Sequence, residues 1–215
     1  GEEACALLPC KLGVKYGPDD MQSMDIFPIN KPMGPILAFI HGGYWSSRSK
    51  RIGRFLAPFY TAAGVNFISV GYRLCPAVQI GSIVEDIRNC LDWIFENAEQ
   101  FEGDNNQIFV AGHSAGGHLT GLMCSPSGPT YLKGGCSLSG IHDLEPIRLS
   151  YLNAQVRLTL NEVDKYSPIR VVESMVPEEV KLPPIIIAVG AKEGQEYLYQ
   201  TNRLTDMLNE AKQPV

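Results

Sequence analysis

Short apolar runs alternate along the chain with longer stretches in which apolar residues recur three or four positions apart. Runs of this kind are typical of strands, and the longer spacing is typical of helices that bury one face. The pattern predicts a half-exposed strand over 24–29 and buried strands over 36–40, 65–70, 108–111, 136–138 and 185–189. It predicts helices over 50–63, 83–100, 115–124 and 197–209.

This alternation predicts an α/β fold, in which a mostly parallel sheet carries helices on both faces. Neither an internal repeat nor a domain boundary is visible, so we expect residues 1–215 to form a single domain. Residues 143–184 are expected to form a cap-like, loop-rich segment within it. Open α/β sheets bind ligands beyond the carboxyl ends of their strands, and this segment is expected there.

Charge and composition narrow the classes of partner. The net charge is −5 and the basic residues form no cluster longer than 48–54, so nucleic acid is not expected as a partner. The longest apolar runs, such as 35–40, are far shorter than the roughly 20 residues that span a membrane. The six cysteines form no C-x-x-C pair and no N-x-S/T acceptor occurs, which favours a cytoplasmic protein. Cys5 and Cys10 are near enough in sequence to pair if the compartment is oxidising.

The segment Gly112-His113-Ser114-Ala115-Gly116 fits the G-x-S-x-G pattern of a nucleophile elbow. In such an elbow a sharp turn from a strand into a helix lifts a serine hydroxyl above the sheet. An apolar strand over 108–111 leads into the motif, and small residues lead out of it, so a strained turn can pack without clashes. The context favours Ser114 as a catalytic nucleophile over an ordinary glycine-rich turn.

The segment His41-Gly42-Gly43-Tyr44-Trp45 follows directly on the buried strand over 36–40. Hydrolases with a nucleophile elbow place an oxyanion-hole loop at this point of the chain. The predicted hole uses the N–H groups of Gly43, Tyr44 and Ala115, aimed at the oxygen that becomes negative in the tetrahedral intermediate. Taken alone, a Gly-Gly turn between aromatic residues is also compatible with a purely structural role.

Together, H-G-G-Y-W and G-H-S-A-G-G-H-L resemble the kynurenine formamidase (arylformamidase) family of the α/β-hydrolases. Further similar segments are G-Y-R-L-C-P over 71–76, L-S-G-I-H-D-L-E-P over 138–146 and Y-S-P over 166–168. The resemblance implies the α/β-hydrolase fold and hydrolysis of N-formylkynurenine to kynurenine and formate by a Ser-Asp-His triad. It implies neither a metal nor an organic cofactor. The short-chain carboxylesterases usually read H-G-G-G in this loop, so Tyr44 and Trp45 favour the formamidase.

The triad acid is expected after the strand over 185–189, where the family's aspartate matches Glu193. Glutamate is a departure from the family pattern, and its extra methylene requires the loop to sit slightly further back. Asp143 is the alternative acid, and a plain surface charge is the other interpretation of Glu193.

The triad of this fold runs Ser, acid, His along the chain, and no histidine follows His142. We expect three histidines in or beside the two motifs to be packed structural residues: His41, His113 and His118. His142 is expected near the rim of the site, within reach of a substrate. The final strand and the loop with the catalytic histidine are therefore expected beyond Val215.

Three hypotheses follow from the residues: an arylformamidase without its C-terminal part, a related short-chain carboxylesterase, and a non-catalytic binding module that kept the fold. The expected partner of the first is a small aryl formamide. A homodimer is the commonest assembly of such proteins.

Overall fold

The computed structural model describes residues 1–29, 31–175 and 181–215. These residues build a seven-stranded sheet in the order β1-β2-β4-β3-β5-β6-β7. The strands are β1 Lys11–Lys15, β2 Ser23–Phe27, β3 Gly34–Ile40, β4 Asn66–Val70, β5 Gly103–His113, β6 Gly134–Leu138 and β7 Ile185–Ala188. β3 to β7 run parallel to one another, whereas β2 pairs antiparallel with both β1 and β4. The expected mostly parallel α/β sheet is thus confirmed.

β1 was not predicted from the hydrophobic pattern. Its residues are mostly exposed, as suits an edge strand that pairs with β2 alone, and the register shifts between Lys11 and Val14. A polar edge strand of five residues carries little apolar signal. The signal is also weak because Gly13, with φ +67°, interrupts it.

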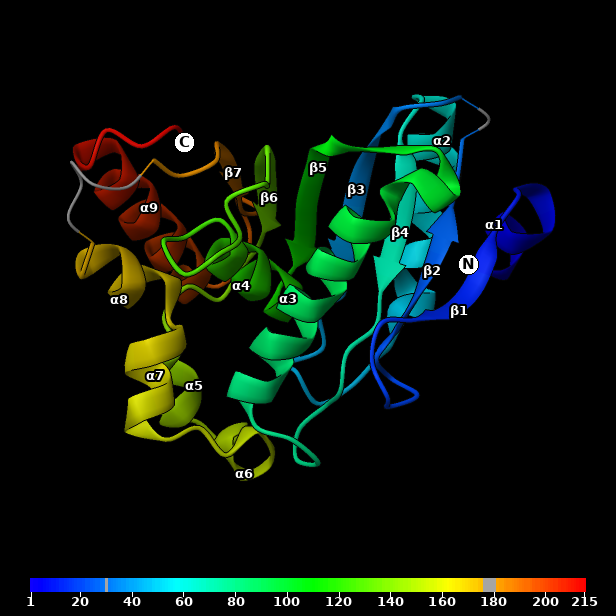
Figure 1. The fold of residues 1–215 in the computed structure, drawn as a ribbon. Coiled ribbons are helices and arrows are strands. Elements are labelled where there is room, and N and C mark those ends of the chain that lie inside the picture. Colours follow the sequence, from blue (N-terminus) through cyan, green and yellow to red (C-terminus); the bar gives the residue numbers. More distant parts are fainter. Residues whose placement is uncertain (30, 176–180) are drawn as a thin grey trace.

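Both faces of the sheet carry helices (Figure 1). On one face lie α3 Ile80–Asn97, α4 Ala115–Met123 and α9 Gln195–Glu210, and on the other lie α1 Glu2–Leu7 and α2 Ala57–Ala62. The single helix expected over 50–63 is in fact a 3₁₀ helix, η1 Lys50–Leu56, followed by α2. A second 3₁₀ turn, η2 Ala98–Phe101, ends the α3 segment.

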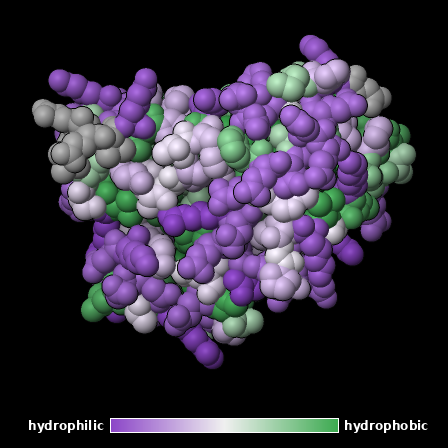
Figure 2. Space-filling view, in the orientation of Figure 1, coloured by the Kyte–Doolittle hydropathy of each residue, from purple (hydrophilic) through white to green (hydrophobic). Residues whose placement is uncertain are grey.

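The alternation of side chains along β3 explains this layering. Ile36, Ala38 and Ile40 join the core beneath α3 and α4, while Leu37 and Phe39 join the smaller core beneath α1 and α2. A fully buried aliphatic side chain contributes about 1.5–3 kcal/mol. In Figure 2 the outer surface on the α3 side is mostly hydrophilic, with small separate hydrophobic patches. The second face is less completely covered, and an apolar groove of about 840 Å³ runs over β5, β6 and β7.

A buried ion pair fixes the segment between β4 and α3. The carboxylate of Asp86, which is completely buried, accepts hydrogen bonds from the Arg73 guanidinium at 2.6 Å and the Arg73 N–H at 3.0 Å. The Gln22 side chain donates to the same carboxylate at 2.7 Å. These bonds join α3 to the residue before β2 and to the segment after β4.

The predicted cap, residues 143–184, is called the cap below. Its described residues form four short helices: α5 Glu145–Arg148, α6 Asn153–Val156, α7 Leu160–Tyr166 and α8 Pro168–Glu173. A capping box between Thr159 and Glu162 begins α7. In Figure 1, α5, α6 and α7 lie beyond the carboxyl ends of the strands, whereas α8 lies beside α9. Residues 176–180 of the predicted cap lie outside the described residues.

Candidate active site

Ser114 stands between β5 and α4 in a strained backbone conformation. Its φ of 57° and ψ of −118° lie in a region that costs a residue with a side chain on the order of 1–3 kcal/mol. Its N–H donates to the Leu138 carbonyl at 2.9 Å, and its carbonyl accepts the His118 N–H at 2.9 Å. Ser114 thus sits at the carboxyl edge of the sheet, on the first residue before a helix, as a nucleophile elbow requires.

The two outer glycines of the motif are required by close backbone contacts. A Cβ on Gly112 would lie 2.3 Å from the Gly116 carbonyl oxygen. A Cβ on Gly116 would lie 2.0 Å from the Ile40 carbonyl oxygen. α4 can therefore begin directly against the end of β3 only because neither position carries a side chain.

The predicted oxyanion loop, residues 41–45, lies against this elbow and is called the oxyanion loop below. A Cβ on Gly42 would lie 2.7 Å from the His113 carbonyl oxygen and 3.1 Å from the Ser114 Cβ. The loop turns through positive φ values at Gly43 (119°), Tyr44 (48°) and Trp45 (55°). Among the described residues, no hydrogen bond uses the N–H of Gly43 or Tyr44. Ala115, at the start of α4, contributes one of the amides that a helix leaves without an internal partner.

Buried aromatic and imidazole rings anchor the loop. Trp45 is completely buried and its indole N–H donates to His118 Nδ1 at 3.2 Å, while His118 Nε2 donates to the Tyr166 carbonyl at 2.7 Å. The His41 ring stacks on Tyr72 at 4.3 Å between ring centres, and its Nδ1 donates to the Gly42 carbonyl at 2.8 Å. Trp45 is therefore a core residue that holds the loop, not a surface for an aryl ring.

Tyr44 points the other way, toward α9. Its hydroxyl lies 3.0 Å from the hydroxyl of Tyr197, and both side chains are half-buried. Burial is the largest effect that raises the pKa of Tyr197, followed by the bond to Tyr44, whereas a hydrogen bond with the Ser114 side chain lowers it. The negative charge of Glu193 raises the same pKa. The contact with Tyr44 therefore joins Tyr197 of α9 to the predicted oxyanion loop.

Glu193 follows β7 and its side chain is exposed. Its Oε1 accepts hydrogen bonds from the Ser139 hydroxyl at 2.5 Å and the Gly190 N–H at 3.1 Å. The Ser139 bond is the largest cause that lowers the pKa of Glu193, and the nearby His113 also lowers it. Glu193 is thus held as a carboxylate on the same side of the sheet as Ser114.

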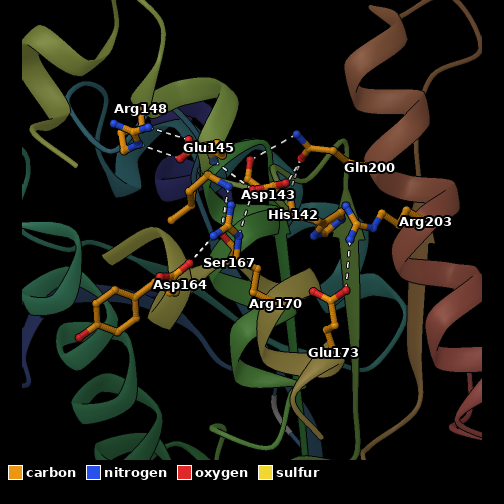
Figure 3. Close-up of polar contacts among 12 residues, drawn as sticks. His142, Asp143, Glu145, Arg148, Asp164, Ser167, Arg170, Glu173, Gln200 and Arg203 are labelled. Atoms are coloured by element: carbon orange, nitrogen blue, oxygen red, sulfur yellow. Dashed lines mark hydrogen bonds and ion pairs between the residues drawn. The ribbon is translucent and has the colours of Figure 1, made fainter. Parts of the chain in front are cut away.

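Asp143, the alternative acid, belongs to a different cluster (Figure 3). Its Oδ1 accepts the Glu145 N–H at 3.0 Å and lies 3.8 Å from the Arg170 guanidinium. The Gln200 amide oxygen accepts the N–H groups of both His142 (2.7 Å) and Asp143 (2.9 Å). Asp143 therefore takes part in the contacts that join the cap to α9.

Two of the expectations for histidines are wrong. His142 does not reach the rim of the site, because it is completely buried between the sheet and the cap. His113, expected to be packed, has an exposed side chain. His41 and His118 are packed as expected, since both are buried. Burial lowers the pKa of three histidines, to about 4 for His41, about 4 for His118 and about 3 for His142.

Three residues near the candidate site were not identified from the sequence motifs: Ser139, Tyr197 and Gln200. Ser139 has a positive φ of 49° and follows β6, the strand between those that precede Ser114 and Glu193. Tyr197 and Gln200 lie three positions apart on α9, so they share a helix face. That spacing was the one feature of the sequence that could have placed Tyr197 and Gln200 together.

The parallel sheet, the strained serine after β5 and the glycine loop after β3 together define an α/β-hydrolase. The BD-FAE family model matches residues 24–139, just over half of the chain. The chain belongs to this family. The matched residues run from β2 to the end of β6 and include both the oxyanion loop and the elbow.

Similar proteins include formamidases and esterases. Kynurenine formamidase of Danio rerio is 26% identical over 217 residues, which cover 98% of this chain and 72% of the relative. Esterase LipC of Mycobacterium tuberculosis is 36% identical over 114 residues, covering 51% of this chain and 28% of the relative. The solved structure of inhibited esterase B from Lactobacillus rhamnosis has a TM-score of 0.78 at 20% identity, covering 99% of this chain and 77% of that one. The chain is a hydrolase of the α/β-hydrolase type.

Nowhere in residues 1–29, 31–175 and 181–215 do three His, Cys, Asp or Glu side chains gather as a set of metal ligands. None of the helices in that part of the chain combines the length and the apolar character needed to cross a membrane.

Proposed function

We propose that the protein is a serine hydrolase that cleaves N-formylkynurenine to kynurenine and formate. The observation that carries the proposal is the strained Ser114 at the start of α4, with the oxyanion loop in contact with it through Gly42. Ser114 Oγ attacks the formyl carbon, and the N–H groups of Gly43, Tyr44 and Ala115 bind the oxygen that becomes negative. Expulsion of the aryl amine leaves a formyl ester on Ser114, which water then hydrolyses to formate.

In this proposal Glu193 orients and stabilises a histidine that takes the Ser114 proton. The triad of this fold runs Ser, acid, His along the chain, so Glu193 holds the place of the acid. The bonds from Ser139 and Gly190 keep Glu193 ionised, which suits a partner of an imidazolium. The similarity to kynurenine formamidases over nearly the whole chain supports the formamide as substrate.

A short-chain carboxylesterase is the second candidate. The higher identity to an esterase, 36% over 114 residues, favours it. An ester and a formamide pass through the same kind of tetrahedral intermediate, so the elbow and the oxyanion loop serve either reaction.

The first experiment labels the full natural chain with a fluorophosphonate and locates the adduct by mass spectrometry. We expect the adduct on Ser114, with labelling and turnover both lost in Ser114→Ala. Ser174→Ala, which changes an exposed serine on the cap, is the matched control and is expected to behave like the wild type. An adduct on another serine would sink the assignment, and a protein that is never labelled would favour a non-catalytic binding module.

The second experiment compares kcat/KM for N-formylkynurenine and p-nitrophenyl acetate on the same preparation. A formamidase is expected to turn over the formamide much faster than an unrelated esterase does. Slow formamide cleavage beside rapid ester cleavage would reject the formamidase in favour of the carboxylesterase.

A further inference from the structure

Ser139 follows β6, the strand that lies between those leading to Ser114 and to Glu193. The peptide group that joins Leu138 to Ser139 is hydrogen-bonded on both sides. Its carbonyl accepts the Ser114 N–H at 2.9 Å, and its N–H donates to the Ala188 carbonyl at 2.7 Å. Ala188 is the last residue of β7, the strand that precedes Glu193. A single peptide group therefore fixes the nucleophile elbow relative to the end of β7.

The backbone of Ser139 is turned out of the strand direction. Its φ of 49° lies in the left-handed region, which residues other than glycine, asparagine and aspartate seldom adopt. Ser139 is buried, and α4 packs closely on the residue after it, since a Cβ on Gly117 would lie 2.8 Å from the Gly140 Cα. A serine held in this unfavourable conformation indicates a use for its side chain.

The side chain of Ser139 contacts Glu193. Its hydroxyl donates to Glu193 Oε1 at 2.5 Å, and the Gly190 N–H donates to the same oxygen at 3.1 Å. Hydrogen bonds to an ionised acceptor are about twice as strong as neutral ones. Among the described residues, no hydrogen bond or ion pair uses the second oxygen, Oε2. Oε1 thus anchors the carboxylate to the sheet, and Oε2 remains for the imidazole of a triad.

We propose that Ser139 is a positioning residue that fixes the carboxylate of Glu193 relative to Ser114. Its backbone joins the ends of β5, β6 and β7, and its hydroxyl extends that placement to the acid. The inference rests on the proposed serine hydrolase with Glu193 as its acid. Ser139 acts on the reaction through Glu193 alone.

Ser139→Gly separates this role from a structural one. Glycine adopts a positive φ without strain but carries no hydroxyl, so the relief of strain offsets the lost hydrogen bond and the urea midpoint should change little. In the full natural chain, kcat for p-nitrophenyl acetate should fall by about 10- to 10²-fold, because misplacement by about 1 Å costs up to about 10² in rate. KM should change less than about twofold, since the acid acts in the transition state. A purely structural role predicts an unchanged kcat in a stable variant.

A double-mutant cycle with Glu193→Gln tests whether Ser139 acts through the carboxylate. The measured quantity is the rate at which a fluorophosphonate labels Ser114. We expect Ser139→Gly to slow labelling when Glu193 is present and to have no further effect in Glu193→Gln. Equal losses in both backgrounds would overturn the inference, as would an unchanged kcat in Ser139→Gly. Ser139→Ala also removes the hydroxyl and replaces Ser139→Gly if that variant does not fold.

Glu102→Gly is the matched control. Glu102 is exposed and also has a left-handed backbone, with φ 61°, but it precedes the start of β5, whereas Ser114 follows the end of that strand. Its replacement by glycine should leave both kcat and the labelling rate unchanged. A loss as large as that in Ser139→Gly would attribute the effect to the backbone and overturn the role of the hydroxyl.

Failure of the inference and failure of the proposed function give different results. If Ser114 is labelled and Glu193→Gln lowers kcat while Ser139→Gly does not, only the role of Ser139 is rejected. If Glu193→Gln is harmless, the assignment of the acid is rejected together with the role of Ser139. If Ser114 is never labelled and no ester is cleaved, the serine hydrolase itself is rejected.

Discussion

Gly116→Ala tests whether the contact between α4 and β3 sets the position of the nucleophile. The new Cβ would lie 2.0 Å from the Ile40 carbonyl oxygen, where ordinary contact needs at least 3.4 Å, so α4 or the end of β3 must move by about 1.4 Å. Overpacking of this kind costs about 1–3 kcal/mol. Alanine recovers about 0.5–1 kcal/mol of helix propensity. We expect a net loss of about 1–2 kcal/mol in the free energy of unfolding.

The effect on catalysis should exceed the effect on stability. A shift of about 1 Å at a reacting group costs on the order of 10²-fold in rate. We expect fluorophosphonate labelling of Ser114 and kcat/KM for p-nitrophenyl acetate to fall by that factor. The free energy of unfolding is measured by urea titration, with the slope m compared to detect changes in the unfolded state.

Gly121→Ala is the matched control on the same helix. Its Cβ would meet side-chain atoms only, at 3.2 Å from Pro168 Cγ and 3.3 Å from His142 Nδ1. We expect a smaller loss of stability than in Gly116→Ala, because only side chains must adjust, and an unchanged labelling rate. If Gly116→Ala matched Gly121→Ala in both measurements, the elbow would not depend on close approach of α4 to β3.

Three further predictions concern charged groups. Asp86→Ala should lower the free energy of unfolding by about 3 kcal/mol, because the donors of Gln22 and Arg73 lose their buried acceptor. Asp20→Ala changes an exposed carboxylate and should alter the free energy of unfolding little. Equal effects of the two substitutions would contradict the argument. Glu193→Gln should lower kcat by up to about 10⁴ while Glu193→Asp retains activity; a larger loss in Asp143→Asn would move the acid to Asp143. The urea midpoint should fall between pH 8 and pH 5. His41, His118 and His142 bind protons near pH 6.5 in the unfolded chain but stay neutral where they are buried, so each lowers the free energy of unfolding by up to about 2 kcal/mol over this range. A constant midpoint would contradict this.

Six of the seven strands in the described residues, β2 to β7, and both motifs were predictable because their signals are local. A buried strand such as β3 is a continuous apolar run over 36–40, and all five of those residues are buried. The elbow and the oxyanion loop are each recognisable within five residues, and their glycines stand where a Cβ would meet backbone. The starts of α3 and α9 were predicted to within three residues, since both helices carry an apolar stripe.

Features that depend on contacts between distant segments were not predictable. Trp45 and His118 are far apart in sequence and bury one another, which removes Trp45 from any contact with substrate. His142 follows β6 at the edge of the expected site, yet the cap covers it completely. Nothing within a single segment indicates how the cap lies on α9.

The strand order explains why separate motifs meet in one place. β3, β5, β6 and β7 are parallel neighbours in that order, so their carboxyl ends bring together four successive pieces of the site. These are the oxyanion loop, Ser114, Ser139 and Glu193. The register pairs Leu138 of β6 with Ala188 of β7, so Ser139 and the loop that carries Glu193 leave the sheet at the same level. The longer side chain of Glu193 can then fold back to both the Ser139 hydroxyl and the Gly190 N–H. Glutamate is therefore accommodated by the bonds around it, and replacing the aspartate of the family pattern does not by itself argue against a triad.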